Sequence, residues 1–153
     1  MRKDSRLSRV LHVLLHMARH DAPFTSEEIA RMLRTDPTVV RRTLAGLRDA
    51  GFVRSEKGHH GGWTVGRPLA EVTLLDVHRA LGMPTLFAIG SGEEDGSCAV
   101  EAVVNAALRD SLADAEARLL ARFGEVTLAD LAGQFDRLCA ESGRDTAHMH
   151  GHD

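Results

Sequence analysis

Apolar side chains recur at helical spacing in a short block that ends at about Leu33. At its start, Thr25 and Glu28 have the spacing of a capping box, and Phe24 and Ile29 have that of a hydrophobic staple. Both signals mark the beginning of a helix. We therefore expect a helix that begins after Thr25.

A second helical block follows after a very short polar stretch. Asp36 is placed as an N-cap, and Pro37 falls in the first turn, where its missing N–H costs nothing. Gly51 ends the block, as glycine commonly does after a helix. Two short helices joined by so few residues must cross at a steep angle. This geometry is typical of a helix-turn-helix, which presents its second helix to a major groove.

The second helix has two distinct faces. The apolar face, expected to point into the core, consists of Val40, Leu44 and Leu47. The other face carries basic and small side chains, and it consists of Thr38, Arg41, Arg42 and Ala45. Arginine can bond guanine edges or hold phosphate, and small side chains allow close approach. The second face therefore has the properties of a recognition helix.

A glycine-rich hairpin is expected after the second helix. Residues 52–56 have the short apolar start of a strand, and residues 63–65 can return antiparallel to it. We interpret the loop between them as a wing that contacts phosphate or the minor groove, because it follows the helix pair; a hairpin loop with solvated histidines is the alternative. The predicted DNA-binding residues are Thr25, Ser26, Thr38, Arg41, Arg42, Ala45, Lys57, His59 and His60.

The C-terminal half is dominated by one long helical pattern from Cys98 to Phe123. Its apolar stripe consists of Val100, Val103, Val104, Ala107, Leu108, Leu112, Ala115 and Leu119. A helix of about 26 residues is about 39 Å long, which one small domain cannot cover. We therefore expect the stripe to form the seam of a two-fold homodimer, with recognition helices about one DNA turn apart. An intramolecular core helix is the alternative.

The remaining patterns complete a mainly α fold, in which a winged helix-turn-helix with a two-stranded wing is followed by a long dimerisation helix and a C-terminal helix. Further helices are expected from Leu7 to about His20, from Thr73 to about Gly82 and from Thr127 to about Glu141. We divide the chain into a DNA-binding domain at 1–67, a linker helix and acidic loop at 68–97, dimerisation and C-terminal helices at 98–141, and a disordered tail at 142–153.

Charge is distributed unevenly along the chain. The 153 residues carry a formal net charge of -3, which by itself does not indicate DNA. However, residues 1–67 contain 13 Lys or Arg against 7 Asp or Glu, a net charge of +6, whereas residues 68–153 contain 6 against 15, a net charge of -9. The positive field therefore lies where the helix pair lies. No apolar run reaches membrane-spanning length and the start does not resemble a signal peptide, so we expect a cytoplasmic protein without a membrane partner.

Four ordered motifs resemble the Rrf2 family of bacterial regulators. They are residues 36–42, 47–53, 58–65 and 72–77, and residues 126–131 also match the family's last helix. The Pro-x-Val-Val-Arg-Arg form of the second helix is similar to the cysteine-poor branch of the family. The resemblance implies a homodimeric transcription factor, in our interpretation a repressor, that binds double-stranded DNA at a pseudo-palindromic operator. It also implies that a sensing site often follows the wing domain.

The cysteines depart from the cluster-binding members of that family. Those members place three cysteines in the loop and helix start where this chain has only Cys98, and Cys139 falls in the last helix. Since an iron–sulfur cluster needs four ligands, mostly thiolates, we expect no cluster, and we predict no other cofactor. At a helix start, the Cys98 thiol would feel the positive end of the helix dipole, which favours thiolate. We therefore interpret Cys98 as a candidate thiol redox sensor, with an inert packed residue as the alternative.

Two groups of histidines have spacings that can hold a metal. His12, His16 and His20 recur on one face of the first helix, but no carboxylate or cysteine stands at a matching position, so we interpret them as a polar face. In the tail, alternate histidines at 148, 150 and 152 would make a weak, unselective site, so we interpret them as solvated. We therefore predict no metal site.

The sequence does not favour an enzyme. Residues 58–63 lack the strand-loop-helix setting of a nucleotide-binding loop, and we assign no catalytic residue. A winged helix that contacts only proteins is the alternative to a DNA-binding regulator. Salt-dependent DNA binding separates the two, because only the DNA binder releases counterions. A regulator that senses a metal or a small molecule is the alternative to a thiol sensor, and the effector, operator and target genes are not predicted.

Overall fold

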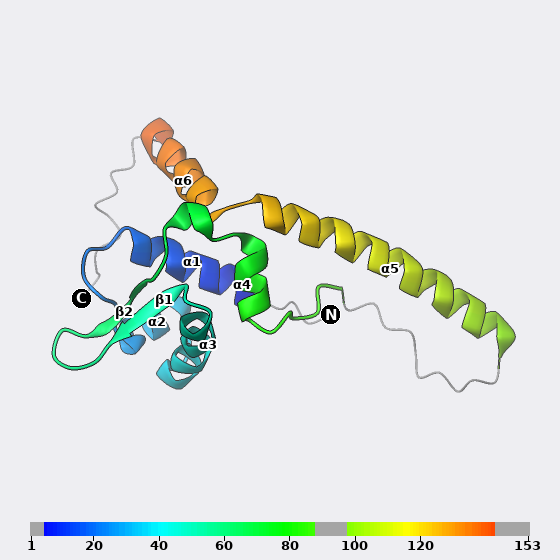
Figure 1. Cartoon of the computed structure of the whole chain (residues 1–153), viewed down its shortest axis with the longest axis horizontal. Helices are drawn as coiled ribbons and strands as arrows, with labels where there is room; N and C mark the ends of the chain where they lie inside the picture. The colour runs from blue at the N-terminus through cyan, green and yellow to red at the C-terminus, as the bar shows by residue number, and fades with distance from the viewer. Residues whose placement is uncertain (1–4, 88–97, 143–153) are drawn as a thin grey trace.

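A computed structural model describes residues 5–87 and 98–142 (Figure 1). In chain order, its elements are α1 (Arg6–Ala18), α2 (Ser26–Leu33), α3 (Pro37–Asp49), β1 (Val53–Glu56), β2 (Gly62–Val65), the 3-10 helix η1 (Leu69–Glu71), α4 (Leu74–Ala80), α5 (Ala99–Glu125) and α6 (Leu128–Ser142). The described part is mainly helical with a two-stranded antiparallel wing, which confirms the predicted fold class. The acidic loop and the His-containing tail of the sequence analysis lie outside the described residues, apart from Ser142 at the end of α6.

The hydrophobic core lies between α1, the α2–α3 pair and the wing, and α4 and the start of α6 close it. Its buried side chains are Val10, Val13, Leu14, Met17, Ile29, Ala30, Val40, Leu44, Leu47, Phe52, Val53, Trp63, Val72, Val77 and Leu128. The inward face predicted for the second helix is therefore confirmed. Because Leu128 of α6 shares this core, the C-terminal helix packs on the same core as α1, α2, α3 and the wing. The division of the chain at residue 67 stays a prediction.

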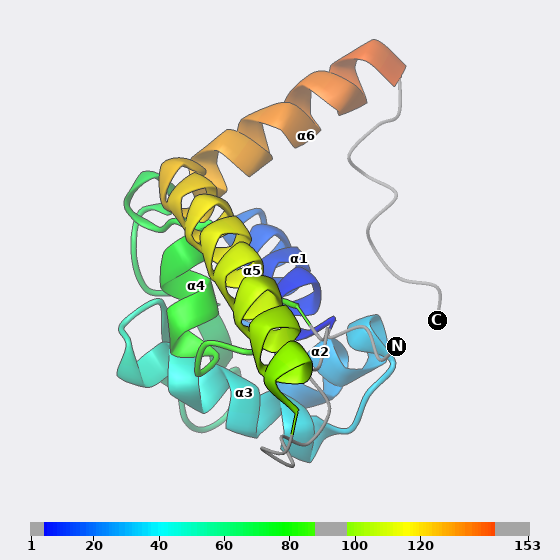
Figure 2. The same cartoon turned by 90° about the vertical axis from the view of Figure 1, so that its right-hand side faces the viewer.

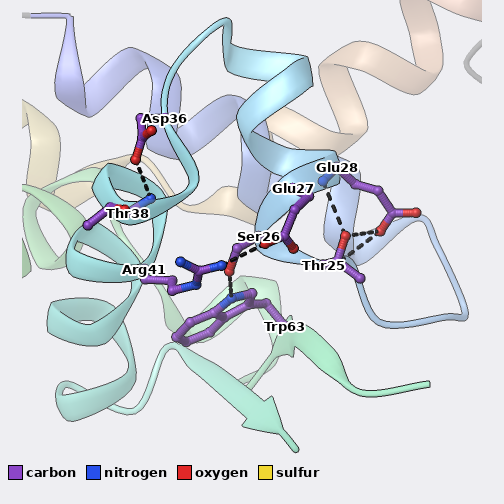
Figure 3. Close-up of polar contacts among 8 residues, drawn as sticks. All are labelled: Thr25, Ser26, Glu27, Glu28, Asp36, Thr38, Arg41 and Trp63. Carbon is purple, nitrogen blue, oxygen red and sulfur yellow. Dashed lines mark hydrogen bonds and ion pairs between the residues drawn. The ribbon is translucent and has the colours of Figure 1, made fainter. Parts of the chain in front are cut away.

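The predicted helix starts are made by the expected caps (Figure 3). The backbone N–H of Thr25 donates to Glu28 Oε2 at 2.7 Å, and the N–H of Glu28 donates to Thr25 Oγ1 at 3.2 Å. At the start of α3, Asp36 Oδ1 accepts from the N–H of Thr38 at 2.7 Å. Gly51 follows α3 with φ 82°, a left-handed conformation that glycine adopts without steric cost.

Backbone bonds join the wing to the chain segment that precedes α2. The N–H of Phe24 donates to the carbonyl of Trp63 at 3.0 Å, and the N–H of Trp63 donates to the carbonyl of Phe24 at 2.8 Å. A side chain at Gly62 could not be accommodated, because its Cβ would lie 2.5 Å from the Phe24 carbonyl oxygen. Glycine at position 62 therefore allows the two backbones to approach this closely. The paired backbone bonds then hold the wing beside the helix pair.

Helix boundaries differ from the predicted ones by one or two residues, as is usual for helix ends. The first helix ends at Ala18, not near His20, because the N–H groups of Arg19 and His20 bond the carbonyls three residues earlier and tighten the last turn. The long helix runs from Ala99 to Glu125, so that Cys98 is its N-cap and not its first residue.

A repeated segment, Val-Thr-Leu-x-Asp, begins both α4 and α6. The two copies pair antiparallel: the N–H of Leu74 donates to the Val126 carbonyl at 2.9 Å, and the N–H of Leu128 donates to the Val72 carbonyl at 2.8 Å. Each copy also forms a capping box in its own helix. This pairing, which local patterns in the sequence do not predict, fixes the end of α5 against α4.

Most of α5 projects away from the rest of the molecule (Figures 1 and 2). Its C-terminal end packs on α4, where the edge of the His78 ring faces Phe123 with the ring centroids 6.0 Å apart. Toward its N-terminus, Val100 and Val103 are 71% and 70% exposed. Among the described residues, no helix combines the length and apolar character needed to cross a membrane.

Candidate nucleic-acid interface

The outward face of α3 has the predicted polarity. Thr38, Arg41 and Arg42 are exposed, and Ala45 is half-buried. Asp36 and Pro37 fix the helix start, so that Thr38 stands in the first turn and the two arginines in the second. The structure therefore places these four predicted residues on one surface, open to a large partner.

The two arginines of α3 differ in their partners. Arg41 reaches from α3 toward the start of α2, where its Nη2 donates to Glu27 Oε1 at 2.6 Å (Figure 3). Both side chains are more than half exposed, so solvent screens the pair and its contribution to stability is small. Arg42 makes no hydrogen bond or ion pair within residues 5–87 and 98–142. Its guanidinium is therefore free to bind a phosphate or a base.

Ser26 lies beneath this surface and not on it. The side chain is buried, and Ser26 Oγ accepts a hydrogen bond from Trp63 Nε1 at 3.0 Å (Figure 3). A buried indole N–H needs such a partner. The Ser26 side chain therefore links α2 to the wing, and its contact with DNA stays a prediction. Thr25 is exposed, but its hydroxyl already donates to Glu28 Oε2 at 2.9 Å.

The predicted wing tip is exposed. Lys57, His59 and His60 all lie in the turn between β1 and β2, and the two imidazole rings are tilted at 56° to each other with centroids 4.0 Å apart. The N–H of Gly61 donates to the carbonyl of Gly58 at 3.0 Å and closes the turn. The wing therefore presents one lysine and two histidines on a short loop beside the helix pair.

A basic hollow beside the wing was not predicted. Arg48 at the end of α3, Arg54 on β1 and Arg67 after β2 line an open depression of about 590 Å³. The guanidinium of Arg67 is held over the Phe52 ring, 5.4 Å from its centroid. The high positive charge of residues 1–67 was the available signal, but the strand positions that bring these arginines together depend on the hairpin register.

Backbone N–H groups hold two nearby carboxylates in their charged form. The N–H of Thr25 lowers the pKa of Glu28, and the N–H of Thr38 lowers the pKa of Asp36. Negative charge therefore persists at the starts of α2 and α3 in neutral solution. Since these carboxylates repel anions, the arginines farther along α3 are the part of this surface suited to an anionic partner.

The candidate sensor and seam residues lie on α5, away from this surface (Figure 1). Cys98 is exposed at the helix start, and the backbone N–H groups of Glu101 and then Val100 lower the pKa of its thiol. Of the predicted seam, Val104 and Leu108 are 50% and 41% exposed. Ala107 and Ala115 are exposed, and Leu112 and Leu119 are half-buried.

Comparison with known proteins gives a family match along most of the chain. The model of the family described as Rrf2, iron-dependent transcriptional regulator, matches residues 4–134. The chain is also similar to YwgB of Bacillus subtilis (strain 168), an HTH-type transcriptional regulator by name, with 33% identity over 68% of this chain and 72% of that protein. The family match extends from α1 through the winged helix-turn-helix into α6.

Solved structures show the same fold. A transcriptional regulator from Lactobacillus plantarum is 23% identical and superimposes with a TM-score of 0.71, over 92% of this chain and 99% of that one. IscR of T. potens is 18% identical, with a TM-score of 0.65 over 95% and 93% of the two chains. At these identities the likeness establishes the fold alone.

Proposed function

Because the chain belongs to the Rrf2 family of transcriptional regulators, which bind DNA through a winged helix, we propose that it acts as a homodimeric repressor at a pseudo-palindromic operator. The observation that carries the proposal is the exposed basic face of α3, where Arg41 and the unpartnered Arg42 stand beside the wing. Helix-turn-helix proteins read base edges with such a face. The family match and the absence of a catalytic constellation in the sequence support a regulator and not an enzyme.

The DNA complex would use three surfaces of this chain. The face of α3 would enter the major groove, and the wing tip with Lys57 would lie on phosphate or in the adjacent minor groove. In the free protein Arg41 is paired with Glu27, so Arg41 would exchange that carboxylate for phosphate or a base. The hollow lined by Arg48, Arg54 and Arg67 adds positive field at the flank.

Selection of genomic fragments by the purified protein, followed by footprinting, tests the proposal. A repressor should protect a site with two-fold sequence symmetry that overlaps a promoter, and its addition should stop transcription from that promoter in vitro. Affinity should fall steeply with salt, because each neutralised phosphate releases counterions. Fragments without symmetry, or affinity that does not depend on salt, would instead favour the winged helix as a protein-contact module.

The projecting α5 supports the homodimer. Its exposed apolar face, which we call the α5 seam, includes Val100, Val103, Val104 and Leu108. Contiguous apolar surface of this kind is rarely left in water and is typical of an association site. A second copy related by a two-fold axis offers the same face in return, so that each seam covers the other.

We also propose that Cys98 makes DNA binding sensitive to oxidation. The thiol is exposed and its pKa is lowered by the N–H groups at the start of α5, so the reactive thiolate is more abundant in neutral solution than for an ordinary cysteine. Oxidation to sulfenate or a mixed disulfide adds bulk and polarity at the end of the α5 seam. A shift of α5 would then change the separation of the two recognition helices.

Mild peroxide should lower the operator affinity of the wild type and of Cys139→Ser, but not of Cys98→Ser. The half-buried Cys139 is the matched control, because it is the other thiol of the chain. The rate of the response should rise with pH as the Cys98 thiol ionises, and it should level off at a lower pH than for an ordinary cysteine. Fluorescence anisotropy before and after treatment measures both. A response that survives in Cys98→Ser excludes this thiol as the sensor.

The iron dependence named in the family description does not fit this chain as a cluster site. Besides Cys98 the sequence holds only Cys139, which lies in α6, and no three potential metal ligands cluster within residues 5–87 and 98–142. Four ligands, mostly thiolates, are the normal requirement. We therefore propose that the protein works without an iron–sulfur cluster. Anaerobically purified protein should contain no stoichiometric iron or sulfide, and a cluster spectrum would refute this.

A further inference from the structure

A groove between α1 and α6 contains two histidines that none of the proposed functions uses. It has a volume of about 200 Å³ and is lined by His12, Leu15, His16, Arg19, Ala132 and Phe135. His12 and His16 lie one turn apart on the same face of α1. Their Nε2 atoms point toward each other and are 2.7 Å apart, with ring centroids separated by 4.6 Å.

We propose that His12 and His16 together bind a divalent late transition-metal ion of the Zn²⁺, Ni²⁺ or Cu²⁺ class through their Nε2 atoms. Histidines four residues apart on a helix can ligate one metal from the same face, and imidazole suits these ions. Spacing alone did not decide this, because solvated histidines have the same spacing. The structure adds the convergence of the two nitrogens at the edge of a groove.

The metal would take the place of a shared proton. At 2.7 Å, one Nε2 donates its hydrogen to the other. When both rings carry their proton on Nδ1, both Nε2 lone pairs are free to bind a metal. Two Zn–N bonds of about 2.0–2.1 Å at a tetrahedral angle need the nitrogens about 3.3 Å apart. A small rotation of the exposed His12 ring would move the two nitrogens this much farther apart.

The surroundings keep His16 in the form that binds metal. Burial in the groove, followed by the charges of His12 and Arg19, lowers the pKa of His16, so its imidazole is neutral in neutral solution. The guanidinium of Arg19 is turned toward α6, where it lies 4.4 Å from the Phe135 ring centroid and contacts the Asp136 carboxylate. This carboxylate offsets the repulsion between Arg19 and a bound cation.

Two imidazoles leave coordination positions for water. No third histidine, cysteine or carboxylate completes a cluster within the described ranges 5–87 and 98–142. The site should therefore have moderate affinity and should prefer Zn²⁺ over Mg²⁺, because Mg²⁺ favours oxygen ligands.

Zinc titration of the full chain tests the site. Calorimetry with Zn²⁺ should use a background in which His148, His150 and His152 are alanine, so that the tail does not contribute. We expect one saturable site per chain, no heat with Mg²⁺, and at least a tenfold weaker affinity in His12→Gln and in His16→Gln. The matched control is the double variant His59→Gln with His60→Gln, which removes the adjacent wing histidines and should bind Zn²⁺ normally.

Additional readouts separate ligation from a folding defect. His12 is exposed, so His12→Gln should keep the helical circular dichroism spectrum and melting temperature of the background protein. Imidazole NMR signals of His12 and His16 should shift together on addition of Zn²⁺, and affinity should fall as the pH is lowered, because protons compete with Zn²⁺ for the imidazole nitrogens. Absence of saturable binding, or zinc affinity unchanged in both variants, would overturn the proposal.

Discussion

Replacing both Arg41 and Arg42 with alanine should abolish specific operator binding while leaving the fold and the oligomeric state unchanged. Each arginine that reads a base is worth about 1 to 3 kcal/mol, roughly a 5- to 150-fold change in affinity. An arginine that holds phosphate should instead lower the slope of affinity against salt by about one per contact. Fluorescence anisotropy with the selected operator, at several salt concentrations, separates the two roles.

The matched control removes the same two positive charges elsewhere. Arg118 and Arg122 lie on α5, with side chains 85% and 69% exposed. The double variant Arg118→Ala with Arg122→Ala should bind the operator nearly as the wild type does. Unchanged affinity and salt slope in the Arg41 and Arg42 double variant would contradict the assignment of α3 as the recognition helix.

Breaking the ion pair between Arg41 and Glu27 should raise operator affinity, the opposite of the effect of removing the arginines. Because Glu27 competes with phosphate for Arg41, Glu27→Gln should raise operator affinity a few-fold in low salt, and the gain should vanish in high salt. Glu116→Gln removes one carboxylate from α5, away from the surface of α3, and should not change operator affinity. A loss of affinity in Glu27→Gln would show that the pair positions Arg41 for the DNA.

Local chemistry made the helix-turn-helix predictable. Asp36 followed by Pro37 is favourable at the start of a helix and unfavourable inside one. The buried positions of Val40 and Leu44 follow from helical periodicity. Such features involve residues close in the chain, so no knowledge of the fold is needed. The same holds for the cap at Thr25, whose hydroxyl and partner are three residues apart.

Contacts between distant segments could not be predicted in this way. Ser26 is the first residue of α2, a position where a polar side chain is normally exposed. It is nevertheless buried, because Trp63 from the wing donates its indole N–H to the Ser26 hydroxyl. The partner of Arg41 also depends on how α2 crosses α3. The pairing of Val72 with Leu128 requires α5 to leave the body and α6 to return to it. In each case tertiary packing decided the role of a residue whose local signal was neutral.

The wing histidines and the α1 histidines illustrate the same limit for site chemistry. The spacing of the α1 histidines can hold a metal but is equally typical of a polar face, and the wing histidines were predicted only as DNA contacts. In the structure, His12 and His16 converge through their Nε2 atoms beside a groove. His59 and His60 instead lie in an exposed turn, with their rings tilted at 56° to each other. Side-chain rotamers distinguish the two pairs, and these are set by the surrounding packing and not by spacing.

A charge in the middle of the α5 seam should separate the dimer. In Leu108→Glu, association would bury a carboxylate without a partner, at a cost of about 3 kcal/mol or more, which weakens the dimer at least about 100-fold. Light scattering at micromolar concentration should therefore find monomer or non-specific aggregate. Operator affinity should fall as well, since each α3 then binds its half-site alone.

Ala113→Glu adds the same charge on another side of α5, at an exposed position outside the seam, and should stay dimeric. Because neither Leu108 nor Ala113 belongs to the hydrophobic core, both variants should keep the wild-type circular dichroism spectrum. A monomeric wild type would refute the α5 seam. A monomeric wild type that still binds a two-fold symmetric operator tightly would place the contact between the two copies on the DNA-binding module, since DNA itself would then bring the copies together.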